Sequence, residues 1–104
     1  MLGSWVRVPA GSLALNNIRA FFMFYTYILF SAKLNKFYVG SAENTEFRLK
    51  QHNAGEVTYT SRGIPWEIKY TEAFHDRTSA MKREYEIKRK KSRKYIEWLI
   101  NSQK

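Results

Sequence analysis

A run of aromatic and branched residues at 22–30, FMFYTYILF, constrains the fold of this chain more than any other part of its sequence. Such residues favour extended backbone, and the run is too short to predict a helix. Polar turn residues follow at 31–35, and KFYVG at 36–40 again has strand character and ends on a glycine. The two segments therefore predict a β-hairpin with a connection of about five residues.

Side chains of an extended strand point alternately to its two faces, and this alternation sorts the residues of the first predicted strand. Tyr27 and Leu29 fall on one face, whereas Thr26 and Ile28 fall on the other. Tyr27 also lies near the centre of the run. We therefore expect its side chain to project from the middle of one face of the sheet.

The remainder of the chain predicts one further strand and three helices. A helix is indicated at 45–53, with Asn44 or Thr45 as its N-cap and Gly55 just beyond its end. The other elements are a strand at 66–74, a helix that is capped by Asp76 or Thr78 and runs to about Lys90, and a last helix capped by Ser92. The predicted fold class is α+β: a small three-stranded antiparallel sheet flanked by helices in the order ββαβαα.

Residues 1–22 differ from the rest of the chain. They contain two arginines, no acidic residue and interrupted apolar runs, with the period of neither a strand nor a helix. We expect an N-terminal extension that is not part of the domain, and residues 23–104 form the single domain that this length predicts. Met23 precedes the first predicted strand, which suits a translation start there. A targeting segment is the alternative interpretation.

The charge of the chain favours a polyanionic partner. Lys and Arg total 18 against 9 Asp and Glu, which gives a net charge of +9. Clustered positive charge binds phosphates by releasing counterions, so nucleic acid is the expected partner. The chain has no cysteine, which excludes a disulfide-linked partner and a thiolate metal site and suits a cytoplasmic location. It has no apolar stretch near the roughly 20 residues of a membrane span, so no membrane partner is expected.

Four polar residues are candidates for a site at one end of the sheet. Tyr27 and Tyr38 lie in the two hairpin strands, and Arg48 and His52 are four residues apart, on one face of the predicted helix. Each has an ordinary explanation when taken singly, because strand tyrosines usually pack and polar residues of short helices are usually solvated.

Several motifs in a fixed order give these residues a common context. YTY at 25–27, YVG at 38–40, Arg48, His52 followed by Asn53, and AMKREYEIK at 80–88 succeed one another at compatible spacing. This pattern resembles the GIY-YIG nuclease superfamily, and residues 23–101 look most like its small stand-alone bacterial members, the YhbQ-like or UPF0213-type group. The resemblance implies hydrolysis of DNA phosphodiester bonds by an activated water, with one divalent cation, Mg²⁺ or Mn²⁺.

The resemblance also implies a set of site residues in this chain. The implied catalytic residues are Tyr27, Tyr38, Arg48, His52 and Glu84, with Glu84 as the metal ligand and Gly40 as the glycine of the second motif. One carboxylate can suffice for Mg²⁺, which keeps several of its waters. Two departures from the superfamily stand beside these matches. Ser41 replaces the lysine that the excision-repair members have after the second motif, and Asn101 is not a secure match to their late asparagine.

Three roles stay open at this stage. Glu84 could instead form an ordinary i,i+4 ion pair with Lys88. Tyr27 could act as a base only if cations lower its pKa or if it relays a proton, because a tyrosine titrates near 10. His52 could be that relay, or it could only hydrogen-bond Tyr38 or a phosphate.

The basic run from Lys82 to Lys94 holds eight Lys or Arg. We expect it to contact the nucleic-acid backbone through Lys82, Lys88, Lys90, Lys91, Arg93 and Lys94, although a solvated helix face would look similar. The favoured function is a metal-dependent endonuclease of low sequence specificity in DNA repair or processing, with RNA as a possible second substrate. The competing function is a nucleic-acid-binding module of the same fold that is non-catalytic or depends on a partner.

Overall fold

The predicted hairpin is present in the structure, a computed structural model that describes residues 23–103. Strands β1 (Phe24–Ser31) and β2 (Lys36–Ala42) pair antiparallel, and Tyr27 lies opposite Gly40. The third strand, β3 (Trp66–Phe74), pairs antiparallel with the other side of β1. The sheet order is therefore β2-β1-β3, with Tyr27 on the central strand. The expectation for residues 1–22 lies outside the described residues.

Three helices follow the predicted N-cap signals, which confirms the α+β fold class. Helices α2 (Thr45–Asn53), α3 (Arg77–Lys90) and α4 (Arg93–Ser102) are capped by Asn44, Asp76 and Ser92. Each of these side chains accepts a hydrogen bond from a backbone N–H in the first helical turn, which would otherwise lack a partner. Within the described part of the chain, no helix has the length and apolar character that crossing a membrane requires.

Two details differ from the prediction. Strand β2 does not end at Gly40, because Ser41 and Ala42 continue the ladder opposite Thr26 and Tyr25. The segment expected as a polar loop contains a 3₁₀ helix, η2 (Thr58–Gly63). This short helix carries no apolar period that would have indicated it, and its place depends on contacts with α2 and β3.

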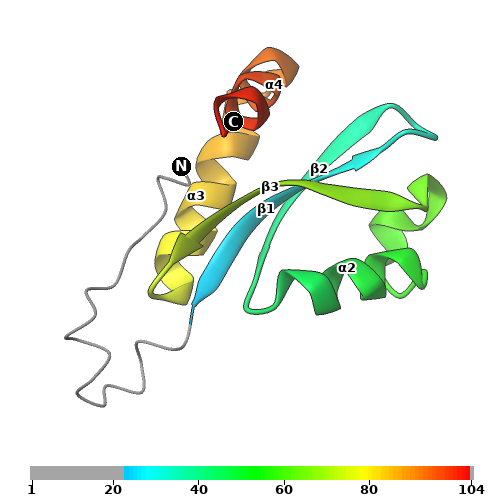
Figure 1. Cartoon of the computed structure of the whole chain (residues 1–104), viewed down its shortest axis with the longest axis horizontal. Helices are drawn as coiled ribbons and strands as arrows, with labels where there is room; N and C mark the ends of the chain where they lie inside the picture. Colours follow the sequence, from blue (N-terminus) through cyan, green and yellow to red (C-terminus); the bar gives the residue numbers. More distant parts are fainter. Residues whose placement is uncertain (1–22, 104) are drawn as a thin grey trace.

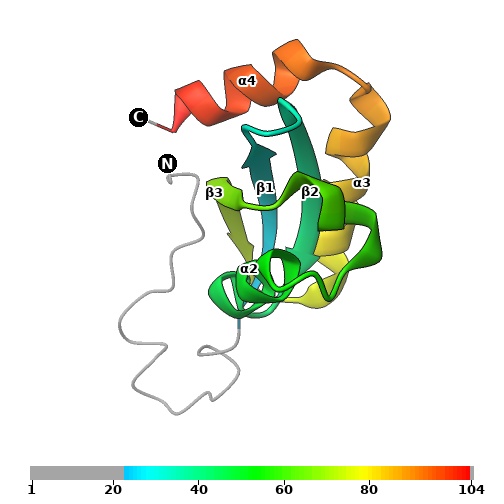
Figure 2. The same ribbon diagram turned by 90° about the vertical axis from the view of Figure 1, so that its right-hand side faces the viewer.

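The sheet lies between two layers of helix (Figure 1). Helices α3 and α4 cover one face, where Ile28, Val39 and Tyr70 of the sheet pack against Ile87 and Leu99. The other face carries α2 and η2, and its buried cluster contains Tyr27, Leu29 and Trp66. The predicted alternation along β1 is therefore confirmed. Figure 2 shows α2 in front of the sheet and α4 crossing one end of it.

Candidate active site

Tyr27 lies flat across the neighbouring strand because its partner residue is a glycine. The side chain of Tyr27 is 2% exposed. A Cβ atom at Gly40 would lie 2.5 Å from the Tyr27 hydroxyl oxygen and 2.7 Å from Cζ, closer than real Cβ atoms approach other heavy atoms. Glycine is therefore required at position 40 for the phenol to occupy this place, which gives a physical reason for the glycine of the second motif.

The Tyr27 hydroxyl begins a chain of buried polar groups. Its oxygen lies 3.1 Å from Nε2 of His52, and Nδ1 of His52 lies 2.7 Å from Oγ1 of Thr60. His52 and Thr60 are 0% and 1% exposed. Both ring nitrogens of His52 thus have protein partners, and the partner of Nε2 is Tyr27 and not Tyr38 or solvent.

The hydrogen-bond partners assign the tautomer of His52. The Thr60 hydroxyl reaches the carbonyl of Val57 at 3.3 Å and can donate to it. Thr60 then accepts from Nδ1–H, which leaves Nε2 as the acceptor for the Tyr27 hydroxyl. The result is one continuous direction of donation from Tyr27 through His52 and Thr60 to Val57.

Three further hydrogen bonds fix this chain of polar groups relative to the sheet. The backbone N–H of Trp66 donates to Oδ1 of Asn53 at 2.7 Å, and Nδ2 of Asn53 donates to the Trp66 carbonyl at 3.1 Å. The indole N–H of Trp66 donates to the Thr60 carbonyl at 2.8 Å. One tryptophan therefore ties the end of α2, the 3₁₀ helix η2 and the start of β3 together.

Burial keeps both central residues neutral at pH 7. It lowers the pKa of His52 to about 4, with the Arg48 charge acting in the same direction. Burial also raises the pKa of Tyr27 to about 12, against the hydrogen-bonding and charge effects of Arg48, which lower it. Coulombic interactions with Tyr38 and Glu84 raise this pKa further. Arg48 and Glu84 thus act on the same phenol from two different helices.

Tyr38 forms the half-exposed border of the site. Its ring centroid lies 5.1 Å from that of His52, 6.5 Å from that of Tyr27 and 5.9 Å from that of Tyr59. The Lys88 ammonium lies 5.8 Å from the centre of the same ring. The predicted pair of tyrosines, the histidine of α2 and a lysine of α3 are thus neighbours at the edge of β2.

The Glu84 carboxylate lies at that edge, with a partner on each oxygen. Ser41 donates to Oε1 at 2.8 Å, and the Lys88 ammonium donates to Oε2 at 2.6 Å. The ion pair with Lys88 that the sequence allowed is therefore present, and it is joined by a hydrogen bond from β2. The Glu84 side chain is 21% exposed, so an ion could still reach its oxygens.

The donor set suits a hard cation that keeps most of its waters. Residues 23–103 contain no group of three or more His, Cys, Asp or Glu that could enclose a metal ion. Glu84 offers a single carboxylate, and Mg²⁺ is commonly held by one or two carboxylates together with substrate phosphates. The residues present therefore fit Mg²⁺ or Mn²⁺ and do not fit a structural zinc site.

The basic run does not form one surface. Lys88 and Lys91 line the groove beside Tyr38. Lys90 instead lines a different hollow, where its ammonium lies 4.9 Å from the centre of the Tyr95 ring. Arg93 also lines the groove beside Tyr38, but it donates to Asn35 and Glu97 and so ties α4 to the hairpin turn. Lys82 and Lys94 are exposed on α3 and α4.

Two of these residues, Thr60 and Ser41, were not predicted to take part in the site. Thr60 lies in a segment expected as a loop, and no motif indicates its contact with His52. Ser41 was noted for the lysine that it replaces, whereas in the structure it donates to Glu84. Helical spacing could have indicated part of this division, because residues 84 and 88 share one face of α3.

The chain is similar in sequence to a known family of proteins. Residues 23–96 match the model of the GIY-YIG catalytic domain. A UPF0213 protein of Staphylococcus haemolyticus is 43% identical over 65 residues, which span 62% of this chain and 78% of the relative. A UPF0213 protein of Bacillus licheniformis is 39% identical over 77 residues, which span 70% of this chain and 78% of the relative. The solution NMR structure of a UPF0213 protein from Bacillus halodurans is 34% identical and covers 76% of this chain and 83% of its own, with a TM-score of 0.48.

Proposed function

Because this chain belongs to the GIY-YIG catalytic-domain family, a family of nucleases, we propose that it is a metal-dependent endonuclease. Its proposed substrate is DNA, which it hydrolyses at phosphodiester bonds with low sequence specificity, in repair or processing. A fold by itself does not establish an activity, so the argument depends on the site. The observation that supports it most is the environment of the Tyr27 phenol. This phenol is hydrogen-bonded to the buried, neutral His52, and its pKa is lowered by Arg48 and raised by Glu84.

Tyr27 and His52 can move a proton together. The phenol is protonated at pH 7 and donates to Nε2 of His52. When Tyr27 accepts a proton from the attacking water, it can pass its own proton to Nε2, so no free tyrosinate has to form. Because the pKa of His52 is lowered to about 4, the imidazolium readily gives up this proton again, which returns the site to its neutral state. Thr60 is the positioning residue that keeps Nε2 free to accept.

Arg48 supplies the positive charge for the phosphate. Its guanidinium is close enough to Tyr27 to lower the pKa of the phenol, and its Nη1 donates to Gln51 at 2.9 Å, which fixes its direction. A planar, permanently charged group at this place can offset the charge that grows on the phosphoryl oxygens. Arg48 therefore has a role that lysine would fill less well.

Glu84 would hold the divalent cation. Such an ion, when bound, polarises the phosphate and stabilises the leaving oxygen. Ser41 positions one carboxylate oxygen for it, and Lys88 occupies the other. The Lys88 ammonium must therefore leave Oε2 or share it, which places a second positive charge near the substrate at the same time.

Replacement of Glu84 tests this proposal. Glu84→Gln keeps the shape of the side chain and removes its charge, so DNA cleavage should fall by about 100-fold or more while DNA binding persists or tightens. Glu86→Gln is the matched control, because Glu86 lies on the same helix and pairs with Arg83 at 3.2 Å, away from the site. Cleavage is measured with labelled single-stranded, duplex, nicked and branched DNA in Mg²⁺, Mn²⁺ or EDTA.

The result separates the two functions considered from the sequence. If Glu84→Gln cuts DNA as fast as the parent at saturating Mg²⁺, Glu84 is not the metal ligand. If the parent binds DNA but cuts none of the substrates in either metal, the chain is a binding module or needs a partner. Thermal unfolding of each variant shows whether a loss of cleavage reflects a loss of the fold.

A further inference from the structure

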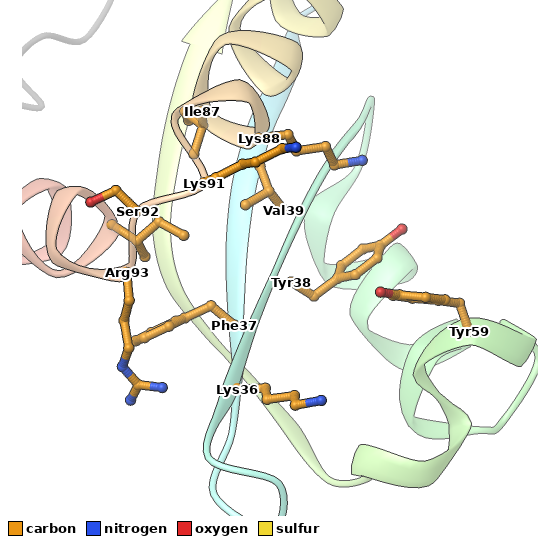
Figure 3. A pocket seen from close by; sticks show the side chains of 11 residues that line it. Lys36, Phe37, Tyr38, Val39, Tyr59, Ile87, Lys88, Lys91, Ser92 and Arg93 are labelled. Atoms are coloured by element: carbon orange, nitrogen blue, oxygen red, sulfur yellow. The ribbon is translucent and has the colours of Figure 1, made fainter.

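A groove of about 660 Å³ follows the outer edge of β2 and opens beside Tyr38. Its walls come from β2, η2, α3 and the start of α4 (Figure 3). Of the residues that line this groove, the cleavage chemistry described above uses only Lys88, and the others have no role in it. The groove is therefore a candidate for binding the part of a substrate that extends beyond the scissile phosphate.

An exposed aromatic ring stands at the mouth of the groove. Tyr59 is 85% exposed, although the next residue, Thr60, is buried and its carbonyl accepts a hydrogen bond from the indole N–H of the buried Trp66. Its ring centroid lies 5.9 Å from that of Tyr38, and Figure 3 shows the two side chains extending toward each other from η2 and β2. A rigidly presented tyrosine in water offers an aromatic face on which a planar ligand can stack.

Positive charge lines the same groove. Lys36, Lys88 and Lys91 contribute side chains, and no carboxylate is among the described residues of the lining. Figure 3 shows Lys88 and Lys91 extending from α3 over β2 in the direction of Tyr38. Lys91 has a φ of 47°, in the left-handed region where glycine is favoured at the end of a helix. A lysine at this strained position places its ammonium group in the groove.

We propose that this groove binds a strand of unpaired nucleotides next to the scissile phosphate, with a base stacked on Tyr59 and the backbone phosphates near the three lysines. The proposal rests on the proposed nuclease function and adds its substrate class. A base offers its face to a side chain only when it is unpaired or flipped out of the duplex. An extended peptide could also add to the edge of β2, but the lysine lining favours a polyanion.

The test measures binding in EDTA, so that cleavage does not interfere. Fluorescence anisotropy compares a short labelled oligothymidylate with a blunt duplex. Tyr59→Ala should weaken binding of the oligothymidylate by about 5- to 100-fold, as expected for loss of one stacked base, and should change duplex binding by less than about twofold. Tyr59→Phe should bind like the parent. Tyr85→Ala is the matched control, because Tyr85 is an exposed tyrosine on α3 outside the groove.

A second measurement uses only the parent protein. An oligonucleotide with abasic positions keeps the phosphates and loses the bases, so it should bind more weakly than oligothymidylate by a similar factor. The proposal is wrong if Tyr59→Ala binds oligothymidylate within about twofold of the parent, if it loses duplex binding equally, or if the abasic strand binds as well. Displacement by polyglutamate as efficient as displacement by oligothymidylate would also contradict base stacking.

Different results would contradict the proposed groove and the proposed nuclease function. Cleavage is measured separately, in Mg²⁺. If the parent cuts no DNA while Tyr59-dependent binding of single strands persists, the proposed function is wrong and the groove remains. If the parent cuts DNA and Tyr59→Ala changes neither single-strand binding nor the choice of substrate, the groove is wrong and the nuclease remains.

Discussion

The two faces of the sheet share the central strand β1, yet they are built in different ways. On the α3 and α4 face, Ile28 packs against Ile87 and Leu99 in an apolar core. On the α2 face, Tyr27 begins a chain of buried polar groups that continues through His52. Adjacent residues of one strand thus serve two environments, one held by packing and the other by directed hydrogen bonds.

The difference indicates where the fold is stabilised and where the chemistry can occur. Apolar packing is non-directional, whereas a buried hydrogen-bond chain fixes each proton at a chosen atom. A buried polar group that lacks a hydrogen-bond partner destabilises the fold, so apolar side chains fill a core with less risk to stability than a chain of polar groups does. Its presence on one face supports the proposal that this face carries the function.

The largest expected effect is on the apolar face. Ile87 is 1% exposed, and Ile87→Ala removes buried methyl groups and leaves a cavity, so the free energy of unfolding should fall by about 2–5 kcal/mol. Met81→Ala is the control on the same helix, because Met81 is half-exposed and should cost about 0.5 kcal/mol or less. Urea unfolding measures both. A cost below about 1 kcal/mol for Ile87→Ala would show that this face is not the main core.

The contribution of the polar face to the stability of the fold should depend on pH. The pKa of His52 is lowered to about 4 in the fold, whereas an unfolded histidine titrates near 6.5. The unfolded chain therefore takes up this proton first as the pH falls. The stability from His52 should be complete above about pH 6.5 and should be lost progressively toward pH 4, by about 3 kcal/mol at most.

Unfolding by urea between pH 4 and pH 7 measures this dependence. His52→Gln should remove the part of the slope that comes from this residue, whatever its effect on stability at pH 7. His75→Gln is the matched comparison, since it makes the same substitution at an exposed histidine outside the buried chain of polar groups. Equal slopes for the parent and His52→Gln would mean that His52 is not held neutral by the fold, and the tautomer derived above would lose its basis.

The elements that the sequence predicted correctly depend on local signals. Asn44, Asp76 and Ser92 cap their helices through contacts three residues away, and alternation along β1 determines both faces. The family was also predicted correctly, because its motifs are short and ordered, and the match over residues 23–96 confirms it. These features depend on neighbours in the sequence, which propensity and spacing describe well.

The features that were not predicted depend on contacts between distant residues. Thr60 meets His52 only because Trp66 holds η2 against α2, and no local pattern records that contact. The reason for Gly40 was also missed, since the ring that lies over it comes from the opposite strand. The roles of the site residues stay predictions, because the structure gives their places and not their chemistry.

The smallest expected effect is on DNA binding, and it compares two neighbouring lysines of the basic run that lie on different sides of the end of α3. Lys91 lines the groove at the edge of β2, whereas Lys90 lies over Tyr95 on the other side of the helix. If the DNA backbone lies along the groove at the edge of β2, Lys91→Gln should weaken DNA binding. It should also reduce the slope of log affinity against log salt concentration by about one unit. Lys90→Gln makes the same change of charge one residue earlier and should alter the slope by much less.

Binding titrations at several salt concentrations, in EDTA, measure both slopes. Equal losses for the two variants would show that the basic run attracts DNA by its total charge, and that the backbone does not follow one side of the helix.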